Sequence, residues 1–425
     1  MARSGRRDLE LRPPARKLTV RIETIGGGGD GVAQVEGRPF YAPLTAPGDL
    51  VAVEARGDRG TVTQILEKSP LRAEPACRHF GVCGGCAFQH LSRAAESGWK
   101  AQQITNALAR AGVEAGRVNP ALTFPAASRR RAVFAVRRLK GAVQFGFNER
   151  RSDRLVAIEE CPVLAPALAA RLAALRSLAG AIPADAFDLS VTACDNGLDV
   201  NIAAPRLQTL AFKDTNAMAR AGVLRLSLNG GLVMATADPV VSFDGAPVTP
   251  PPGAFLQASR EGEAALIGLV RDAVGKARRI ADLFCGCGTF TLPLAKAASL
   301  AAFDSDAASI AALKRAAAAA QASASPINPL RAETRDLFER PLTAKELKNF
   351  DAVVFDPPRA GAERQASEIA GSSAPLVIGV SCNPKTFARD AALLAAAGYH
   401  LIEVTPVDQF VYSPHIELVG VFAKG

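Results

Sequence analysis

The chain has 425 residues, of which 48% are hydrophobic, so we expect two or three folded domains, and global disorder is excluded. Its formal net charge of +9 favours a polyanionic partner such as a nucleic acid. No run of about 18 uncharged apolar residues predicts a membrane span, and the basic N-terminus lacks the apolar segment of a signal peptide. We therefore expect a cytoplasmic protein with a disordered basic leader at residues 1–17.

Residues 18–70 are predicted to form a small β-barrel. Short stretches that alternate apolar and polar residues are separated by turns rich in Gly, Pro and Asp, and they cover residues 18–23, 31–35, 50–54 and 61–65. An OB-like barrel fits this spacing, and that fold often binds oligonucleotides. A small β-domain without a ligand is the alternative.

Residues 71–250 are predicted to form a central α+β domain. The patterns indicate helices at 99–112 and 164–178 and strand pairs at 132–136 with 143–147 and at 189–191 with 198–202. The Pro-Pro-Pro-Gly run at 250–253 is typical of a linker.

After this linker, helix and strand patterns alternate through residues 251–425. Helices are predicted at 260–274, 291–296 and 307–322, and strands at 279–283, 300–303, 350–355 and 375–380. This rhythm is typical of a doubly wound, Rossmann-like parallel sheet, which makes the expected fold class α/β.

The spacing of four cysteines predicts a metal centre in the central domain. Cys77, Cys83 and Cys86 form a C-x5-C-x2-C motif, and Cys161 precedes a proline far downstream. Four thiolates suit either zinc or an iron–sulfur cluster, and three clustered cysteines plus a distant Cys-Pro favour 4Fe-4S. Unligated core cysteines are the remaining alternative. A basic run, residues 129–131 followed by 137–140, is a candidate for phosphate contact or a solvated strand face.

Three loops follow predicted strands of the last domain, at the edge where such sheets bind ligands. The first is Asp282-Leu283-Phe284-Cys285-Gly286-Cys287-Gly288, whose glycines let the backbone approach a nucleotide-like cofactor. The G-x-G-x-x-G spacing is incomplete, and Asp304 ends the next strand, where its carboxylate suits the ribose of S-adenosylmethionine.

The other two loops carry Asp356-Pro357-Pro358-Arg359 and Ser381-Cys382-Asn383-Pro384. Arg359 stands where adenine-amino methyltransferases have an aromatic residue, which argues against amine methylation. Cys382 supports another route, in which a thiolate adds to carbon-6 of uracil and so activates carbon-5. That route needs a base to remove the carbon-5 proton, and His415-Ile416-Glu417 offers a carboxylate.

With these motifs the sequence resembles the TrmA/RumA family of RNA (uracil-5-)-methyltransferases over nearly its whole length, including a TRAM-type barrel at the N-terminus. The resemblance implies that Cys382 is the nucleophile and Glu417 the base, and that the four cysteines hold a 4Fe-4S cluster. It also implies S-adenosylmethionine contacts from Gln257, Phe284, Thr289, Asp304, Asp336 and Asp356. Thr289 stands where Asn is common in the family, and Asp304 where Glu is common.

The implied enzyme is a class I, S-adenosylmethionine-dependent methyltransferase that flips a uridine of structured RNA into its site. The barrel favours 23S ribosomal RNA, because family members that act on the transfer RNA T-loop commonly lack it. A transfer RNA enzyme is the first alternative, and a catalytically silent RNA-binding or ribosome-assembly factor is the second. We expect no membrane association and no obligatory protein partner.

Overall fold

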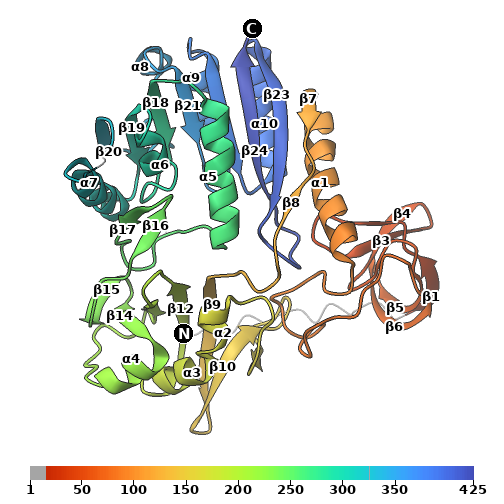
Figure 1. Ribbon diagram of the computed structural model, residues 1–425. Coiled ribbons are helices and arrows are strands. Elements are labelled where there is room, and N and C mark those ends of the chain that lie inside the picture. Colours follow the sequence, from red (N-terminus) through yellow and green to blue (C-terminus); the bar gives the residue numbers. More distant parts are fainter. Residues whose placement is uncertain (1–15, 325) are drawn as a thin grey trace, which may run out of the picture. The chain divides into compact units, whose positions relative to one another are not determined.

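Figure 1 shows the computed structural model of the protein, which describes residues 16–324 and 326–425. The chain forms two compact units. Among the described residues, the smaller unit comprises 16–81, Cys86–Trp99 and Tyr412–Pro414, and the larger comprises Val82–Gly85, 100–324, 326–411 and His415–Gly425. Residues 1–15 of the predicted leader lie outside the described residues. Within the two described ranges, no helix is long and apolar enough to cross a membrane.

The smaller unit is built on one six-stranded sheet. In β5, Val51, Val53 and Ala55 are buried in alternation with more exposed neighbours, as the period of two requires. The strand that contains Pro39 was missed by the sequence analysis, because proline in a run argues against a strand. The strands are β1 (Arg16–Arg21), β2 (Thr24–Ile25), β3 (Gly31–Val35), β4 (Arg38–Ala42), β5 (Leu50–Arg56) and β6 (Arg59–Glu67), in the order β1-β5-β6-β4-β3-β2.

The larger unit contains a seven-stranded sheet that is antiparallel except between β13 and β14. Its apolar face packs against short helices around Phe134, Leu175 and Leu189. The order is β11-β10-β9-β12-β13-β14-β15, formed by β9 (Arg131–Leu139), β10 (Ala142–Asn148), β11 (Leu155–Ala157), β12 (Ala186–Ala193), β13 (Leu198–Ala203), β14 (Val223–Leu228) and β15 (Gly231–Ala235). A separate pair, β16 (Val241–Phe243) and β17 (Ala246–Val248), follows, and α4 (Thr215–Ala221) precedes β14.

The single helix predicted at 164–178 is wrong in one respect, because the structure has two helices there. These are α2 (Pro166–Ala169) and α3 (Leu172–Gly180), and Arg171 between them leaves helical geometry with φ −110° and ψ 4°. Leu168 and Leu172 are both buried on either side of the break. The apolar spacing continues across it, so periodicity alone could not reveal it.

The second sheet of the larger unit positions the candidate site. Its order is β20-β19-β18-β21-β22-β24-β23-β7, with β8 also paired to β23. The strands from β20 to β22 run parallel, and β24 runs antiparallel between β22 and β23. The strands are β7 (Ala115–Val118), β8 (Leu122–Thr123), β18 (Arg279–Leu283), β19 (Ser299–Asp304), β20 (Leu330–Thr334), β21 (Ala352–Phe355), β22 (Leu376–Ser381), β23 (Tyr399–Asp408) and β24 (Glu417–Lys424).

Helices cover both faces of this sheet, as the α/β prediction requires. One core includes Leu266 of α5 and Leu313 of α7, and the other includes Leu108 of α1 and Leu394 of α10. The helices are α1 (Arg93–Arg110), α5 (Arg260–Val274), α6 (Thr291–Ala295), α7 (Ala307–Gln321), α8 (Ala344–Leu347), α9 (Glu363–Ala370) and α10 (Pro384–Ala396). The strand order reverses between β18 and β21, so the loops after these two strands flank the crevice in which such sheets bind ligands.

Candidate active site

The loop that carries Cys382 is tied to the loop that follows β21. Asn383 caps α10 by accepting a hydrogen bond from the backbone N–H of Lys385 at 3.1 Å. Its Nδ2 donates to the backbone oxygen of Arg359 at 3.0 Å, and the hydroxyl of Thr386 donates to the same oxygen at 3.3 Å. These bonds fix the backbone on both sides of the thiol.

The pairing of β22 with β24 brings Glu417 to Cys382. Ser381 pairs with Leu418, so the next residues of the two antiparallel strands are Cys382 and Glu417. Glu417 is only 3% exposed, and Cys382 is half-buried. Burial, followed by the carboxyls of Glu417 and Asp356, raises the pKa of the Cys382 thiol to about 11, whereas Arg359 acts to lower that pKa. The structure therefore brings the predicted nucleophile and base together.

Asp356 and Glu417 form an interacting pair of carboxyl groups. Burial raises the pKa of Asp356 to about 7. Burial also raises the pKa of Glu417 well above its ordinary value, the charge of Asp356 acts in the same direction, and a hydrogen bond with Gln409 acts in the opposite direction. Because two nearby carboxyls resist ionising together, the charge of Asp356 adds to the effect of burial on the pKa of Glu417.

Two glutamine side chains link these carboxyls. Gln257 donates from Nε2 towards Asp356 Oδ2 at 3.5 Å, and Gln409 donates from Nε2 to Gln257 Oε1 at 2.7 Å. Gln409 Oε1 accepts a hydrogen bond from the backbone N–H of Ser259 at 3.3 Å. Both glutamines are almost fully buried, so their orientation is set by these partners.

The glycine loop after β18 has the backbone geometry of a cofactor loop. Phe284, Gly286 and Gly288 all have positive φ, of 63°, 53° and 99°. A Cβ at Gly288 would lie 2.6 Å from the Cδ1 atom of Leu313 on α7, and the positive φ at this position also disfavours a residue other than glycine. The Gly286 N–H donates to Asp304 Oδ2 at 2.9 Å, which joins this loop to the carboxyl end of β19.

The remaining predicted cofactor residues lie on neighbouring loops. Thr289 is half-buried and directly precedes Phe290 and α6. Asp336 accepts a hydrogen bond from the backbone N–H of Phe338 at 2.9 Å, and the Phe338 ring packs 5.5 Å from that of Phe284.

Asp282, at the end of β18, is the most deeply buried acid beside this loop. Its Oδ2 accepts a hydrogen bond from the Thr291 hydroxyl, whereas its Oδ1 has no hydrogen-bond partner among the described residues. Burial, followed by the charges of Asp356 and Asp304, raises its pKa to about 7 despite the Thr291 bond. An unsatisfied buried carboxyl oxygen suits a cationic or hydrogen-bond-donating ligand.

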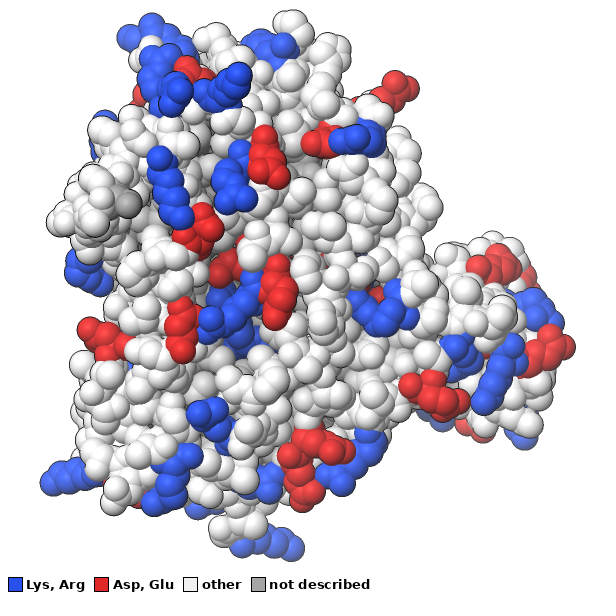
Figure 2. Space-filling model, viewed as in Figure 1, with Lys and Arg blue, Asp and Glu red and all other residues white. Residues whose placement is uncertain are grey.

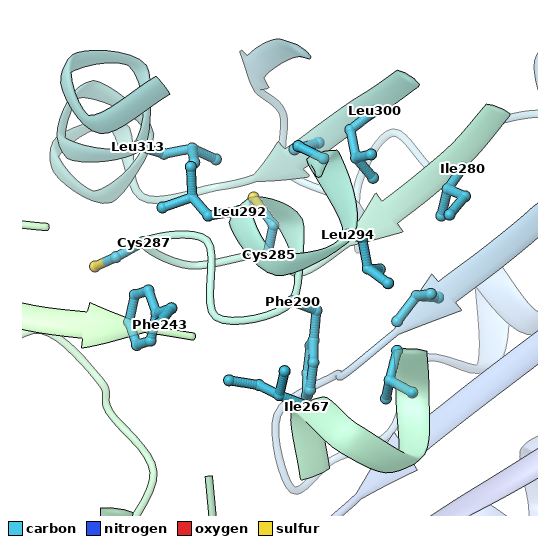
Figure 3. Close-up of a cluster of buried hydrophobic side chains, with 14 of the residues drawn as sticks. Phe243, Ile267, Ile280, Cys285, Cys287, Phe290, Leu292, Leu294, Leu300 and Leu313 are labelled. Carbon is cyan, nitrogen blue, oxygen red and sulfur yellow. The ribbon is translucent and has the colours of Figure 1, made fainter. Parts of the chain in front are cut away.

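The two cysteines of the glycine loop after β18 belong to the hydrophobic core. Figure 3 shows Cys285 and Cys287 among Phe290, Leu292 and Leu294, and both side chains are almost fully buried. Burial raises the pKa of Cys287 to about 11 and that of Cys285 well above its ordinary value. Their surroundings indicate packing rather than chemistry.

The four cysteines of the predicted cluster are all half-buried. Cys77 and Cys86 belong to the smaller unit, and Cys83 and Cys161 to the larger. Within residues 16–324 and 326–425, no group of three or more His, Cys, Asp or Glu side chains is arranged to hold a metal ion.

The basic run at 129–131 is not a solvated strand face. Arg130 is 2% exposed, forms an ion pair with Glu263, and donates to the backbone oxygen of Gln257 at 3.0 Å. Arg131 donates to the backbone oxygen of Leu256 and lies over the ring of Phe255 at 5.2 Å. Arg130 is thus unavailable for the phosphate contact that the sequence suggested.

The second part of the basic run lines a groove. Arg137 and Arg138 border a cavity of about 870 Å³ together with Glu149, Arg154 and Asp185. On the face drawn in Figure 2, Lys and Arg side chains are interspersed with Asp and Glu. Phosphate contact by Arg137 and Arg138 stays a prediction.

Comparison with known proteins places this geometry in a family. A family model described as tRNA (Uracil-5-)-methyltransferase matches residues 251–424. An RNA methyltransferase of Caulobacter vibrioides is 45% identical over 95% of this chain and 99% of its own length. The 23S rRNA (uracil(1939)-C(5))-methyltransferase RlmD of Halomonas elongata is 32% identical over 93% of this chain and 87% of its own. The chain belongs to the RNA (uracil-5-)-methyltransferase family.

A solved family structure has the same fold. The tRNA (uracil-54, C5)-methyltransferase of Pyrococcus abyssi, determined with S-adenosyl-L-homocysteine, aligns with a TM-score of 0.74 and covers 96% of this RNA (uracil-5-)-methyltransferase and 100% of its own chain. Its sequence identity is 23%, so the likeness concerns the fold. The predicted α/β methyltransferase fold and family membership are confirmed.

The sequence analysis missed two residues near the site of this family member. Gln409 follows the carboxyl end of β23, which reaches the same edge of the sheet as the other loops, but no strand was predicted there. Phe255 is 69% exposed, two positions before Gln257. Its position two residues before the predicted cofactor residue Gln257 could have indicated a role in the site, since unstacked bases stack on exposed aromatic rings.

Proposed function

We propose that this protein transfers a methyl group from S-adenosylmethionine to carbon-5 of a uridine in RNA, with Cys382 as nucleophile and Glu417 as base. The observation that carries the proposal is the placement of a half-buried thiol and a buried carboxyl at adjacent positions of paired strands. A thiol beside a base suits covalent catalysis, because the base can act once the adduct has formed.

The residues around the glycine loop fit the cofactor. S-adenosylmethionine would supply an electrophilic methyl group and a positive charge. The unsatisfied Oδ1 of Asp282 and the raised pKa values of Asp282 and Asp356 are what a site for a cation is expected to have before it is filled. Phe284, Thr289, Asp304 and Asp336 would hold the nucleoside, with Gln257 and Asp356 on the side that faces Cys382.

The reaction would proceed in two stages on this chain's own side chains. First the Cys382 thiolate would bond to carbon-6 of uracil. The electrons of the C5=C6 bond would then bind, at carbon-5, the methyl group supplied by S-adenosylmethionine, whose S–CH3 bond would break to leave a neutral thioether. Then the C5–H bond breaks as Glu417 takes the proton, the C5=C6 bond re-forms, and the sulfur leaves as thiolate. We assign to the exposed ring of Phe255, over which Arg131 lies, the role of stacking on the flipped base.

We propose 23S ribosomal RNA as the substrate. Support comes from the RlmD relative, which covers most of the chain, and from the six-stranded N-terminal sheet, to which we assign the role of a TRAM domain that contacts RNA. Such an enzyme would act in the cytoplasm, where ribosomal RNA is modified.

We also assign Cys77, Cys83, Cys86 and Cys161 to a 4Fe-4S cluster. The backbone around Cys83 fits a ligating thiolate, because the Gly85 N–H donates to its Sγ at 3.5 Å. A Cβ at Gly84 would lie 2.9 Å from the backbone oxygen of Asn148, so this segment requires glycine to lie where it does. The cluster would have a structural role.

Covalent trapping tests the function. A 23S rRNA fragment that contains 5-fluorouridine should form an adduct with the wild-type enzyme and S-adenosylmethionine that survives a denaturing gel, because fluorine cannot leave as a cation. Cys382→Ala should bind the RNA without an adduct, and Glu417→Gln should trap even the unfluorinated RNA. A transfer RNA T-loop carrying the same base is the matched control for substrate.

If the enzyme binds both 5-fluorouridine RNAs but forms a Cys382-dependent adduct with neither, the mechanism is wrong. If only the T-loop RNA gives one, the chemistry stands and the assignment to ribosomal RNA is wrong.

A further inference from the structure

Phe255 presents an aromatic ring to solvent from the start of a segment whose next residues are buried. Its side chain is 69% exposed, whereas Leu256 and Gln257, which follow it, are 2% and 3% exposed. The backbone that carries the ring is therefore fixed on one side by the core, while the ring itself lies outside the core.

The segment after Phe255 is bonded to the arginines at the start of β9. The Arg130 N–H donates to the backbone oxygen of Ala258 at 2.9 Å, and Arg130 Nε donates to that of Gln257 at 3.0 Å. Arg131 Nη1 donates to the backbone oxygen of Leu256. Two arginines thus satisfy three successive carbonyls, at 256, 257 and 258, which sets the course of the backbone that leads from Phe255 to Gln257.

Arg131 also contacts the ring itself. Its guanidinium carbon lies over the Phe255 ring, 5.2 Å from the centroid. Burial, followed by the charges of Arg130 and Arg129, lowers the pKa of Arg131 to about 10, so the side chain is positively charged at neutral pH but only partly hydrated. A cation attracts an aromatic ring more strongly when it has lost part of its water. The contact is therefore suited to holding the ring in one place.

We propose that Arg131 is a positioning residue for Phe255: its guanidinium lies over the ring and fixes the adjoining carbonyl, which holds the ring in the position that stacks on the flipped uracil. A ring that is fixed before RNA arrives loses less conformational entropy on binding. This inference rests on the proposed function. It deepens that function by giving part of the basic run 129–131 a role in binding a base rather than a phosphate.

RNA binding by full-length variants tests this role. Arg131→Met removes the charge and the donor, and it should weaken binding of a 23S rRNA fragment roughly five- to tenfold. The loss should disappear when Phe255→Leu is already present, because the two residues act as one unit. The slope of log affinity against log salt concentration should stay that of the wild type. A phosphate contact would instead lower that slope by about one unit, and its loss would add to that of Phe255→Leu.

The RNA supplies a second test. In a fragment with an abasic site at the position that forms the 5-fluorouridine adduct, the ring has no flipped base to stack on. Wild type and Arg131→Met should then bind equally. A loss of affinity in Arg131→Met that persists with the abasic RNA overturns the proposal.

Arg171→Met is the charge-matched control. Arg171 lies between α2 and α3, whose residues pack with Phe134 on the apolar face of the sheet. Arg131 lies three residues before Phe134 on β9, so its side chain points to the other face. Arg171→Met should bind RNA as the wild type does.

Arg131→Lys keeps the charge and a donor but lacks the planar guanidinium, and it replaces Arg131→Met if that variant does not fold. It should show a smaller loss of affinity that is again absent beside Phe255→Leu. Folded Arg131 variants that bind RNA as tightly as the wild type overturn the proposal, as do variants whose loss is undiminished beside Phe255→Leu. Either result, obtained with a wild-type enzyme that forms the 5-fluorouridine adduct, leaves the proposed function intact.

Discussion

At the scale of single residues, burial and the surrounding charges set the pKa of the Cys382 thiol. Its pKa of about 11 reflects burial first and then the carboxyls of Glu417 and Asp356, and the positive charge of Arg359 acts to lower it. The thiolate is therefore scarce in the resting enzyme at neutral pH. A bound cation would favour it, which ties the reactivity of the sulfur to occupation of the cofactor site.

This environment predicts how Cys382 reacts with a neutral alkylating reagent. Because its pKa lies near 11, the rate of modification by iodoacetamide should rise roughly tenfold for each pH unit between 7 and 10. Arg359→Gln should slow the reaction at a fixed pH, since the guanidinium lowers the thiol pKa. Mass spectrometry of the Cys382 peptide measures the rate. A rate of modification that is already high at pH 6 and does not change at higher pH would show that the thiol is ionised in the resting enzyme.

Short motifs in the sequence made most of these residues predictable, but the residues that contact them could not be predicted. Cys382, Glu417 and Asp356 stand in short local patterns that name their chemistry. The bond between Gln257 and Gln409 joins residues 152 positions apart, and no local pattern marks such a pair. Likewise, the sequence shows Arg130 only as part of a basic run of the kind found on protein surfaces, and the tertiary fold is what places Glu263 beside it.

At the scale of elements, the predictions succeeded where local signals were strong. Helix α5 and strand β18 have the predicted bounds, because Ser259 caps the helix and a buried apolar run forms the strand. Helix α1 begins at Arg93, six residues before the predicted start at 99, where the Ser92 hydroxyl accepts a hydrogen bond from Ala95. That serine was a visible capping signal that the analysis overlooked.

The Arg130–Glu263 ion pair connects the residue that precedes β9 to helix α5. We expect this pair to contribute to the free energy of unfolding. Burial raises the pKa of Glu263 even though Arg130 opposes the rise, so the carboxylate depends on its partner. Arg130→Ala should lower the free energy of unfolding by about 3–5 kcal/mol, because it leaves a buried carboxyl unpaired. Urea unfolding measures the loss.

The double variant Arg130→Met with Glu263→Met is the control, and it should recover much of that stability. If Arg130→Ala unfolds like the wild type and loses only RNA affinity, the arginine serves the phosphate contact suggested by the sequence instead.

At the scale of the whole molecule, the proposed cluster would join Cys161 to three cysteines that lie far from it in the sequence. Protein purified without oxygen should be brown and contain iron and sulfide in about a four-to-four ratio. Cys83→Ser should give mostly insoluble protein, since structural metal ligands are coupled to folding. Cys194→Ser replaces a cysteine outside the predicted ligand set and should leave the iron content unchanged. Stoichiometric zinc without iron would contradict the assignment.

Strand β24 carries Glu417 and lies between β22 and β23, both of which precede it in the chain. During synthesis β22 and β23 therefore cannot complete their pairing in the sheet until residues 417–424, which form the strand between them, have left the ribosome. Premature termination anywhere before Glu417 would thus remove the proposed base and leave two apolar strands with open edges. Such a fragment would be prone to proteolysis or aggregation. It would therefore not persist as a folded protein that forms a covalent adduct with RNA and cannot resolve it.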